Sequence, residues 1–567
     1  MLNFNKRLGF NKKIILSALV VTLVAVFSIL LLNKNSALPT LNTQSHWYQD
    51  GQEAVLSASR KVINNTPGAA KNIILFVGDG MSMTTVTAAR IFAGQQANQS
   101  GEEFSLSFEH FPWTGLSKTY NTNQQIPDSA GTMTAMMTGI KTKAGLIGID
   151  DQSERANCES YLNSDNPDLM TTLELAEIAG KATGIVSTAR LTHATPAAVY
   201  AKTPERDWES STTPDEEDRI NDCIDIASQL INFSEHLRNT LDIKDPSASE
   251  IDGIDVAFGG GRAMFFDDDP DTLVGFSESV DEGRRKDGRN LIREWINQGG
   301  TYVMDQTSFD NLTDQNNGNV LGLFNPSHMR FEADRHNDTA GEPSLSEMTL
   351  KAIDLLEEDE DGFFLMVEGG RIDHAHHDNN AYSALNETVE FSNAVAAAYA
   401  ATNPDETLII VTADHSHVMT MAGYTTRGNP ILGKVFSNDD AGNPETDAKL
   451  DRQDMPYTTL NYINGRGFAD YADRADGKYE KIELEEGQEP PPFPRRVDLN
   501  NVNTETPGFH QESFIPLIEE THSGEDVPIY AIGPGSHLLS GSIEQNVIFH
   551  VMNFAGNLEQ LAKNALK

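Results

Sequence analysis

A short segment, EGGRIDHAHHD at residues 368–378, holds the densest group of candidate metal ligands in the sequence. Asp373 and His377 are four residues apart, so a helix would place a carboxylate and an imidazole on one face. Zinc binds such mixtures of Asp and His, and three histidines within four residues are rarely a feature of core packing. We therefore interpret this segment as a metal site, in preference to a satisfied polar cluster.

A second candidate ligand lies in the stretch KNIILFVGDGMS at residues 71–82. The apolar run from Ile73 to Val77 predicts a strand buried on both faces, and Asp79 follows it between two glycines. Open α/β sheets bind ligands beyond the carboxyl ends of their strands, so Asp79 is a candidate metal or phosphate ligand. The alternative interpretation is a strand-terminating Asp in a tight turn.

A later segment ends in the same way, and one further candidate ligand precedes a predicted strand. The predicted strand in TLIIVTADHSHV is followed by Asp414 and His415, with His417 two residues further on. His522 precedes another apolar run, VPIYAIG, and is the remaining ligand candidate. The carboxyl ends of parallel strands meet at one edge of a sheet, so these side chains are expected to converge there.

A candidate nucleophile lies in the segment IPDSAGTMTAMMTG at residues 126–139. Pro127 and Asp128 predict a turn, which places Ser129 at the N-terminus of a helix. Free backbone N–H groups and the positive end of a helix favour a phosphate and lower the cost of forming a serine alkoxide. The segment lacks the GxSxG pattern of common serine hydrolases. Ser129 as a simple helix N-cap is the alternative.

The predicted strand TGIVSTA leads into RLTHATPAAVYA, so His193 and Thr195 lie beyond its carboxyl end. Further on, the guanidinium of Arg206 could form a fork onto a phosphate. A surface arginine without a role is the alternative for this residue.

The composition is that of a globular protein and argues against nucleic-acid binding. The 567 residues include 84 acidic and 42 basic ones, and a formal charge of -42 should repel nucleic acid but suits divalent cations. The alternation of strand and helix patterns predicts an α/β fold. Length alone allows about two to four average domains or one large domain with insertions.

The N-terminus carries Lys6, Arg7 and further lysines before the apolar segment 14–32, which is the order of an export signal. The segment is long enough to span a bilayer, so residues 1–37 are either a signal peptide or an N-terminal membrane anchor, and 38–46 are a linker. In either case we expect the body to be exported. Cys158 and Cys223 are the only cysteines, and in an oxidising compartment they predict a disulfide.

Taken together, the motifs around Asp79, Ser129, Glu368–His377, Asp414 and His522 resemble those of the alkaline phosphatase family. The resemblance covers most of the exported chain and is closer to the animal-type branch, because a KDGRNLIREW segment and a long insertion before His522 are present. It implies a doubly wound, mostly parallel α/β sheet flanked by helices, formed by residues 47–422 and 516–567. Residues 423–515 would be an insertion that caps the site and the surface of a homodimer.

The same resemblance implies a role for each candidate residue. Ser129 matches the phosphorylated nucleophile and Arg206 the arginine that clamps the phosphate. The ligands of the first zinc would be Asp373, His377 and His522; those of the second zinc Asp79, Asp414 and His415; and those of a magnesium ion Asp79, Thr195 and Glu368. Beside these ligands would lie Asp128, His193, His374 and His417. Met133 and Met136 depart from the smaller residues expected in the nucleophile helix.

The implied function is that of an exported alkaline phosphatase, periplasmic or extracellular, which hydrolyses small phosphate monoesters through a phosphoserine intermediate. Two zinc ions on opposite sides of phosphorus would stabilise the attacking and leaving oxygens, and magnesium suits the all-oxygen ligand set. The competing hypotheses are a phosphodiesterase or sulfatase of the same superfamily and a metal- or phosphate-binding protein without activity.

Overall fold

The computed structural model describes residues 63–165, 167–211, 223–244, 250–269, 283–313, 318–467 and 496–567, together with Gln49, Glu53 and Lys61. The chain divides into two compact units, Met1–Val62 and Ile63–Lys567. The predicted signal or anchor (1–37) and the linker (38–46) lie outside the described residues. Within the described part of the chain, no helix combines the length and the apolar character needed to cross a membrane. The elements that follow all belong to the second unit.

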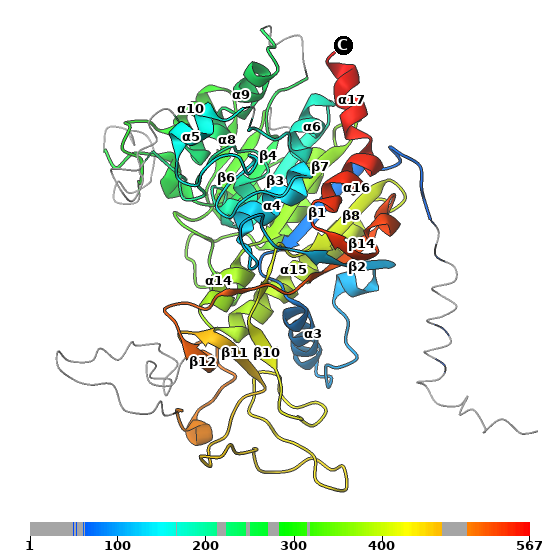
Figure 1. Cartoon of the computed structure of the whole chain (residues 1–567), viewed down its shortest axis with the longest axis vertical. Helices are drawn as coiled ribbons and strands as arrows, with labels where there is room; N and C mark the ends of the chain where they lie inside the picture. Colours follow the sequence, from blue (N-terminus) through cyan, green and yellow to red (C-terminus); the bar gives the residue numbers. More distant parts are fainter. Residues whose placement is uncertain are drawn as a thin grey trace, which may run out of the picture. The chain divides into compact units, whose positions relative to one another are not determined.

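A ten-stranded sheet in the order β15-β2-β14-β8-β1-β7-β3-β4-β6-β5 forms the centre of this unit (Figure 1). The seven strands from β8 to β5 run parallel, whereas β14 is antiparallel to both β8 and β2. The predicted mostly parallel α/β sheet is therefore confirmed. The strands are β1 (Asn72–Gly78), β2 (Trp113–Lys118), β3 (Ala182–Arg190), β4 (Val256–Gly260), β5 (Thr301–Val303), β6 (Val320–Leu323), β7 (Phe363–Gly369), β8 (Thr407–Thr412), β14 (Val527–Ile532) and β15 (Gly541–Glu544).

The central strands are buried on both faces because their apolar runs feed two separate cores. In β1, Ile73 and Leu75 pack into one core, and the alternate residues Ile74 and Phe76 pack into the other. Helices cover both faces of the sheet, which is the doubly wound arrangement (Figure 1). One core includes side chains of α4 (Ser129–Thr138), α6 (Thr172–Ile178) and α16 (Val547–Gly556), and the other includes side chains of α3 (Met83–Gln96), α13 (Leu345–Leu356) and α15 (Ala381–Ala401).

The remaining elements are short and connect or flank these layers. They are η1 (Ser107–His110), α5 (Cys158–Asn163), α7 (Ala194–Ala197), α8 (Ile226–Ile231), α9 (Phe233–Thr240), η4 (Arg262–Phe265), α10 (Leu291–Asn297), α11 (Gln306–Asp310), α12 (Glu332–Arg335), α14 (Arg371–His377), β9 (Ser416–His417), β10 (Met419–Met421), β11 (Leu460–Gly465), η8 (Leu499–Asn501), β12 (Ser513–Pro516), β13 (His522–Ser523), η9 (Ser536–Leu539) and α17 (Leu558–Ala565).

A three-stranded sheet, β10-β11-β12, lies below the main sheet in Figure 1. It crosses both predicted boundaries of the 423–515 insertion, because β10 precedes residue 423 and β12 extends past residue 515. Tyr462 of β11 connects this sheet to the main body, since its hydroxyl lies 2.8 Å from Nδ1 of His376 in α14. The insertion is thus in direct contact with the helix that holds the predicted metal ligands.

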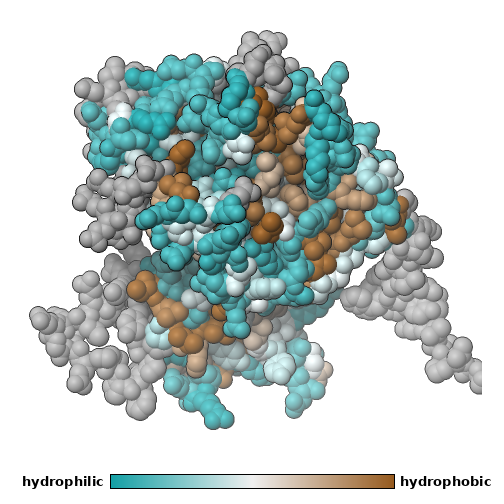
Figure 2. All heavy atoms as spheres, turned by 45° about the horizontal axis from the view of Figure 1, so that its top comes forward, coloured by the Kyte–Doolittle hydropathy of each residue, from teal (hydrophilic) through white to brown (hydrophobic). Residues whose placement is uncertain are grey.

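The face of the molecule in Figure 2 is predominantly hydrophilic, and its apolar side chains gather in separate patches. Among the described residues, the large apolar side chains with the greatest exposure are Tyr424 at 96%, Ile518 at 89% and Phe514 at 80%. All three lie within or directly beside the predicted insertion.

The predicted disulfide between Cys158 and Cys223 is present, with the two Cα atoms 6.0 Å apart. It closes a loop with a sequence separation of 65 residues between α5 and the segment before α8. Loop-closure entropy gives such a crosslink about 4 kcal/mol of stabilisation.

We expect the double variant Cys158→Ala/Cys223→Ala to unfold at a lower temperature, because its unfolded chain gains conformational freedom. The measurement is the midpoint of thermal unfolding of the wild type and the variant without reductant. A midpoint equal to that of the wild type would contradict this expectation.

Candidate active site

Three buried carboxylates meet at the carboxyl edge of the central sheet. Asp79 follows β1, Glu368 lies near the end of β7 and Asp414 follows β8, and these strands are adjacent in the order β8-β1-β7. Gly80, at φ +69°, donates its backbone N–H to Oδ1 of Asp414 at 3.1 Å. A Cβ at Gly80 would come within 2.2 Å of His417, so this turn requires glycine. The strand ends thus bring the first predicted ligands together.

The first predicted zinc group is assembled from α14 and β13. Asp373 and His377 lie one helical turn apart, with Oδ1 and Nε2 separated by 3.2 Å. Nε2 of His522 lies 3.2 Å from Nε2 of His377 and 3.5 Å from Oδ1 of Asp373. Ligand atoms of a tetrahedral zinc ion, at metal distances of about 2.0–2.1 Å, are separated from one another by about 3.3 Å. The spacing of these three atoms therefore fits a zinc ion.

The orientation of the two imidazoles also fits metal binding. Nδ1 of His377 lies 2.5 Å from the backbone oxygen of Glu520, and Nδ1 of His522 lies 2.8 Å from that of Pro127. A metal-binding histidine commonly donates its other ring N–H to a carbonyl or a carboxylate. These contacts leave both Nε2 atoms directed at Asp373.

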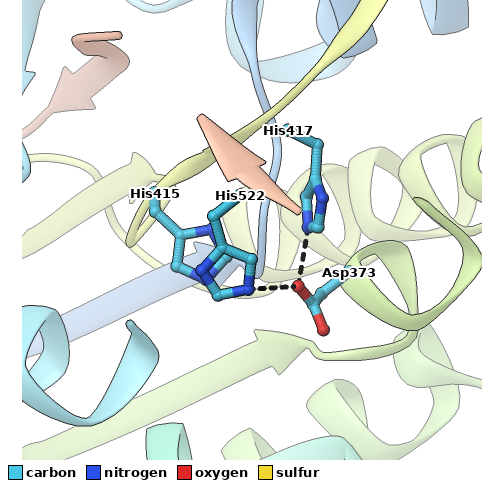
Figure 3. Close-up of side chains that lie close together, drawn as sticks. All are labelled: Asp373, His415, His417 and His522. Atoms are coloured by element: carbon cyan, nitrogen blue, oxygen red, sulfur yellow. Dashed lines mark hydrogen bonds and ion pairs between the residues drawn. The ribbon is translucent and has the colours of Figure 1, made fainter. Parts of the chain in front are cut away.

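His417 was predicted to lie beside the candidate ligands. It contacts one of them, Asp373, directly. Its Nε2 lies 2.6 Å from Oδ1 of Asp373, and Figure 3 shows the His415, His417 and His522 side chains gathered around that carboxylate. Nδ1 of His417 lies 2.5 Å from a carboxylate oxygen of Glu520. Burial alone would lower the pKa of His417, but the carboxylates of Glu520 and Asp373 raise it to about 10. An imidazolium between two carboxylates partly compensates the acidic charge of the site.

The second predicted zinc group adjoins Ser129. Nε2 of His415 lies 3.3 Å from Oδ1 of Asp79, 3.3 Å from Oδ2 of Asp414 and 3.2 Å from Oγ of Ser129. Burial raises the pKa of Asp79, and the neighbouring carboxylate of Asp414 raises it further. Both carboxylate oxygens of Asp79 and Oδ2 of Asp414 are buried without a hydrogen-bond partner. Unpaired buried carboxylates are costly unless a cation binds them.

The predicted magnesium ligands also include buried side-chain oxygens without a hydrogen-bond partner. Oε1 of Glu368 and Oγ1 of Thr195 are buried without a partner, whereas Oε2 of Glu368 accepts a hydrogen bond from Ser187. Burial raises the pKa of Glu368 to about 8. Candidate ligand atoms of Asp79, His193 and Glu368 lie within 4.8 Å of one another. Oxygen-rich sets of this kind suit magnesium, and the His/Asp sets suit zinc.

Helix α4, which contains the predicted nucleophile, begins at Ser129 as predicted, but its N-cap is Asp128. Oδ1 of Asp128 accepts a hydrogen bond from the backbone N–H of Gly131 at 3.2 Å. The serine is therefore not needed as the cap, and its hydroxyl faces His415. Met133 and Met136 are fully buried in the core beneath α4, so these departures from the family pattern are accommodated by packing.

Arg206 lies beside Asp128, the N-cap of α4, rather than on an open surface. Its Nη1 lies 3.2 Å from Oδ2 of Asp128, and its side chain is 18% exposed. Nη2 lies 3.3 Å from Nε2 of His193. The guanidinium is thus held next to the N-terminus of α4.

His374 lies in a small group of imidazoles at the edge of the site. Its ring centroid lies 4.0 Å from that of His328 and 5.4 Å from that of His193. Burial, together with the charge of Arg371, lowers the pKa of His374 to about 3. The side chain is therefore neutral at neutral and alkaline pH.

Several neighbours of the site were missed in the sequence. Glu520 holds two histidines but was not singled out, although it lies only two residues before His522. Ser187 lies within β3, and its contact with Glu368 depends on the pairing of β3 with β7. His328 follows β6 on a loop with no pattern that marks it. Tertiary contacts, rather than local patterns, place all three.

Comparison with known proteins agrees with this geometry. The family model for alkaline phosphatase matches residues 70–558. The tissue-nonspecific alkaline phosphatase of Mus musculus is 40% identical over 519 residues, which cover 90% of this chain and 88% of the mouse protein. The human isozyme is 38% identical over 92% of this chain and 90% of its own length. The alkaline phosphatase of Gadus morhua is 36% identical over 92% and 99%, respectively.

Two solved bacterial structures share the fold. The alkaline phosphatase of the Antarctic bacterium TAB5 superposes with a TM-score of 0.53 at 22% identity, over 88% of this chain and 99% of that one. The Thermus thermophilus alkaline phosphatase gives a TM-score of 0.56 at 23% identity, over 90% and 98%. With the family match spanning the sheet and every candidate ligand, this chain is an enzyme that belongs to the alkaline phosphatase family.

Proposed function

We propose that this enzyme is an exported, metal-dependent phosphomonoesterase that works through a phosphoserine intermediate, with two zinc ions and one magnesium ion. The observation that carries the proposal is the position of Ser129. Its Oγ lies at the N-terminus of α4, 3.2 Å from the candidate ligand His415. Arg206 is ion-paired to Asp128, the residue immediately before Ser129.

The assignment of ions to residues follows the chemistry of the donors. Asp373, His377 and His522 would hold one zinc ion, and Asp79, Asp414 and His415 the other. Thr195, Glu368 and the shared Asp79 would hold magnesium. When bound, these ions would supply Lewis-acid stabilisation of the oxygens that attack and leave phosphorus. A TAB5 alkaline phosphatase mutant has been solved with magnesium in its M3 site, which supports a role for this ion.

The protein's own groups would act in two steps. Ser129 Oγ loses its proton and forms a bond to phosphorus as the ester P–O bond breaks, and the leaving oxygen takes up a proton and departs as the alcohol on the opposite side. Water then attacks phosphorus, the Oγ–P bond breaks, inorganic phosphate is released and Ser129 regains its proton. In both steps Arg206 donates hydrogen bonds to phosphate oxygens while Asp128 fixes its orientation, and the N-terminus of α4 stabilises the developing negative charge.

The choice among the candidate reactions can be tested directly. We expect hydrolysis of p-nitrophenyl phosphate at alkaline pH, and much slower hydrolysis of bis-p-nitrophenyl phosphate and p-nitrophenyl sulfate. Faster turnover of the diester or the sulfate would favour a phosphodiesterase or a sulfatase. Metal and phosphate binding without turnover of any of the three would favour a binding protein.

We also propose a periplasmic or extracellular location, supported by the apolar segment 14–32 and by the disulfide. Whether residues 1–37 act as a cleaved signal or as an anchor would be answered by N-terminal sequencing of the exported protein. A homodimer that buries the exposed Tyr424, Phe514 and Ile518 is the proposed assembly. Size-exclusion chromatography with light scattering tests it.

Removal of metal ions should abolish activity and lower stability together. Without cations, the carboxylates of Asp79, Glu368 and Asp414 lie buried with unpaired oxygens and repel one another. We expect prolonged dialysis against EDTA to eliminate p-nitrophenyl phosphate hydrolysis and to lower the thermal midpoint. Zinc with magnesium should restore both properties, whereas calcium alone should not. Full activity in a protein shown by elemental analysis to be metal-free would refute the metal-dependent proposal.

A further inference from the structure

The segment that contains Arg206 forms backbone hydrogen bonds with a neighbouring loop. The backbone N–H of Arg206 donates to the oxygen of Gly145 at 3.0 Å, and that of Ala156 donates to the oxygen of Pro204 at 3.0 Å. Residues 203–206 therefore run alongside residues 145–156. The position of the Arg206 backbone depends on this loop.

Arg155, in the same loop, forms two hydrogen bonds with Glu205, the residue that precedes Arg206. Its Nε donates to Oε2 of Glu205 at 2.8 Å and its Nη2 to Oε1 at 2.9 Å, which is a two-point fork. The side chain of Glu205 is only 9% exposed, against 45% for Arg155. The backbone N–H of Asp207 also donates to Oε1 of Glu205, at 3.2 Å. One carboxylate thus fixes the chain on both sides of Arg206.

Gly145 gives Arg155 a second path to the guanidinium of Arg206. The N–H of Gly145 donates to Oδ2 of Asp128 at 2.9 Å, and that same oxygen is ion-paired with Nη1 of Arg206 at 3.2 Å. Arg155 lies directly over Gly145, since a Cβ there would come within 2.2 Å of its Nε. Gly145 also has a φ of +83°. Arg155 therefore covers the residue that anchors both the backbone and the head group of Arg206.

We propose that Arg155 is a positioning residue for the phosphate-binding Arg206, acting through Glu205 and Gly145. The inference rests on the proposed function, because it assigns phosphate binding to Arg206. Arg155 lies three residues before Cys158, so the disulfide holds one end of this support. A half-exposed ion pair adds little to global stability, whereas a small displacement of a substrate-binding group can cost one to two orders of magnitude in its function.

The test measures phosphate affinity rather than stability. Arg155→Ala should raise both the inhibition constant of inorganic phosphate and KM by about tenfold, with kcat changed less than about threefold. Arg155→Lys should recover part of the affinity, because it keeps the charge but loses the fork. Arg335→Ala is the matched control. Arg335 makes the same fork onto Glu332, at 2.8 and 3.0 Å, and this variant should leave both constants unchanged.

A double-variant comparison separates positioning from general structural support. If Arg155 acts through Arg206, then Arg155→Ala should add no further loss of phosphate affinity in an Arg206→Ala enzyme. An equal loss in both backgrounds, or an unchanged inhibition constant in the single variant, would overturn the inference. A wild-type enzyme without phosphatase activity would instead refute the proposed function.

Discussion

The variant Ser129→Ala is expected to lose more than about a thousandfold in kcat for p-nitrophenyl phosphate, because removal of a nucleophile eliminates the covalent route. Its metal content should stay close to that of the wild type. The predicted ligand sets are carboxylates, imidazoles and one threonine hydroxyl, and none of them includes Ser129. Kinetic assays combined with elemental analysis of the purified variant provide the measurement.

A trapping experiment makes this prediction more specific. After incubation with phosphate and an acid quench, intact-protein mass spectrometry should detect one covalent phosphoryl group on the wild type and none on Ser129→Ala. Thr138→Ala, at the opposite end of α4, is the control, since its hydroxyl bonds only to backbone groups nearby. Loss of metal together with activity in Ser129→Ala would show that the serine has a structural role instead.

The second large effect concerns stability at alkaline pH. Asp255, just before β4, is partly buried, and this burial raises its pKa to about 7. Its unfolded value is about 3.9, so between these two values the folded protein binds more protons than the unfolded chain does. Stability contributed by the protonated form is therefore lost as pH rises through this window. Well above pH 7, the free energy of unfolding is lower by at most about 4 kcal/mol for this reason.

Asp255→Asn should therefore stabilise the enzyme most above pH 7. The amide has the shape of the protonated acid, and its oxygen can still accept the 2.7 Å hydrogen bond from the backbone N–H of Thr183. We expect a higher thermal midpoint than that of the wild type at pH 8.5, with a smaller difference at pH 5. Asp405→Asn, on the exposed surface, should change neither value. A difference that does not depend on pH would contradict this explanation.

The sequence predicted those parts of the fold and site that depend on short-range patterns. The continuous apolar runs before Asp79 and Asp414 predicted strands buried on both faces, and the structure has buried strands at both places. The four-residue spacing of Asp373 and His377 is set by one helical turn. The edge strand β15 and its neighbour β2 were not predicted, because GSIE and WTGLSK are mixed, partly exposed sequences without an apolar run.

The roles of residues that are positioned by tertiary contacts could not be predicted from local sequence patterns. Glu520 contacts His377 and His417 only because β13 pairs with β9. Gln545, from the turn before α16, supports Asp414 by donating to its backbone oxygen at 2.7 Å. Arg155 reaches Glu205 across two loops. Each of these partners is determined by the packing of segments that are distant in the chain.

The strand order also determines when the site can form during synthesis. β1 lies between β7 and β8, so Asp79 leaves the ribosome long before the strands that flank it. His522 follows later still, on β13, and β14 pairs with β8 only after that. A nascent chain that ends before β13 thus exposes carboxylates and imidazoles that lack their final partner. The complete set of candidate ligands can therefore come together only after β13 has been synthesised.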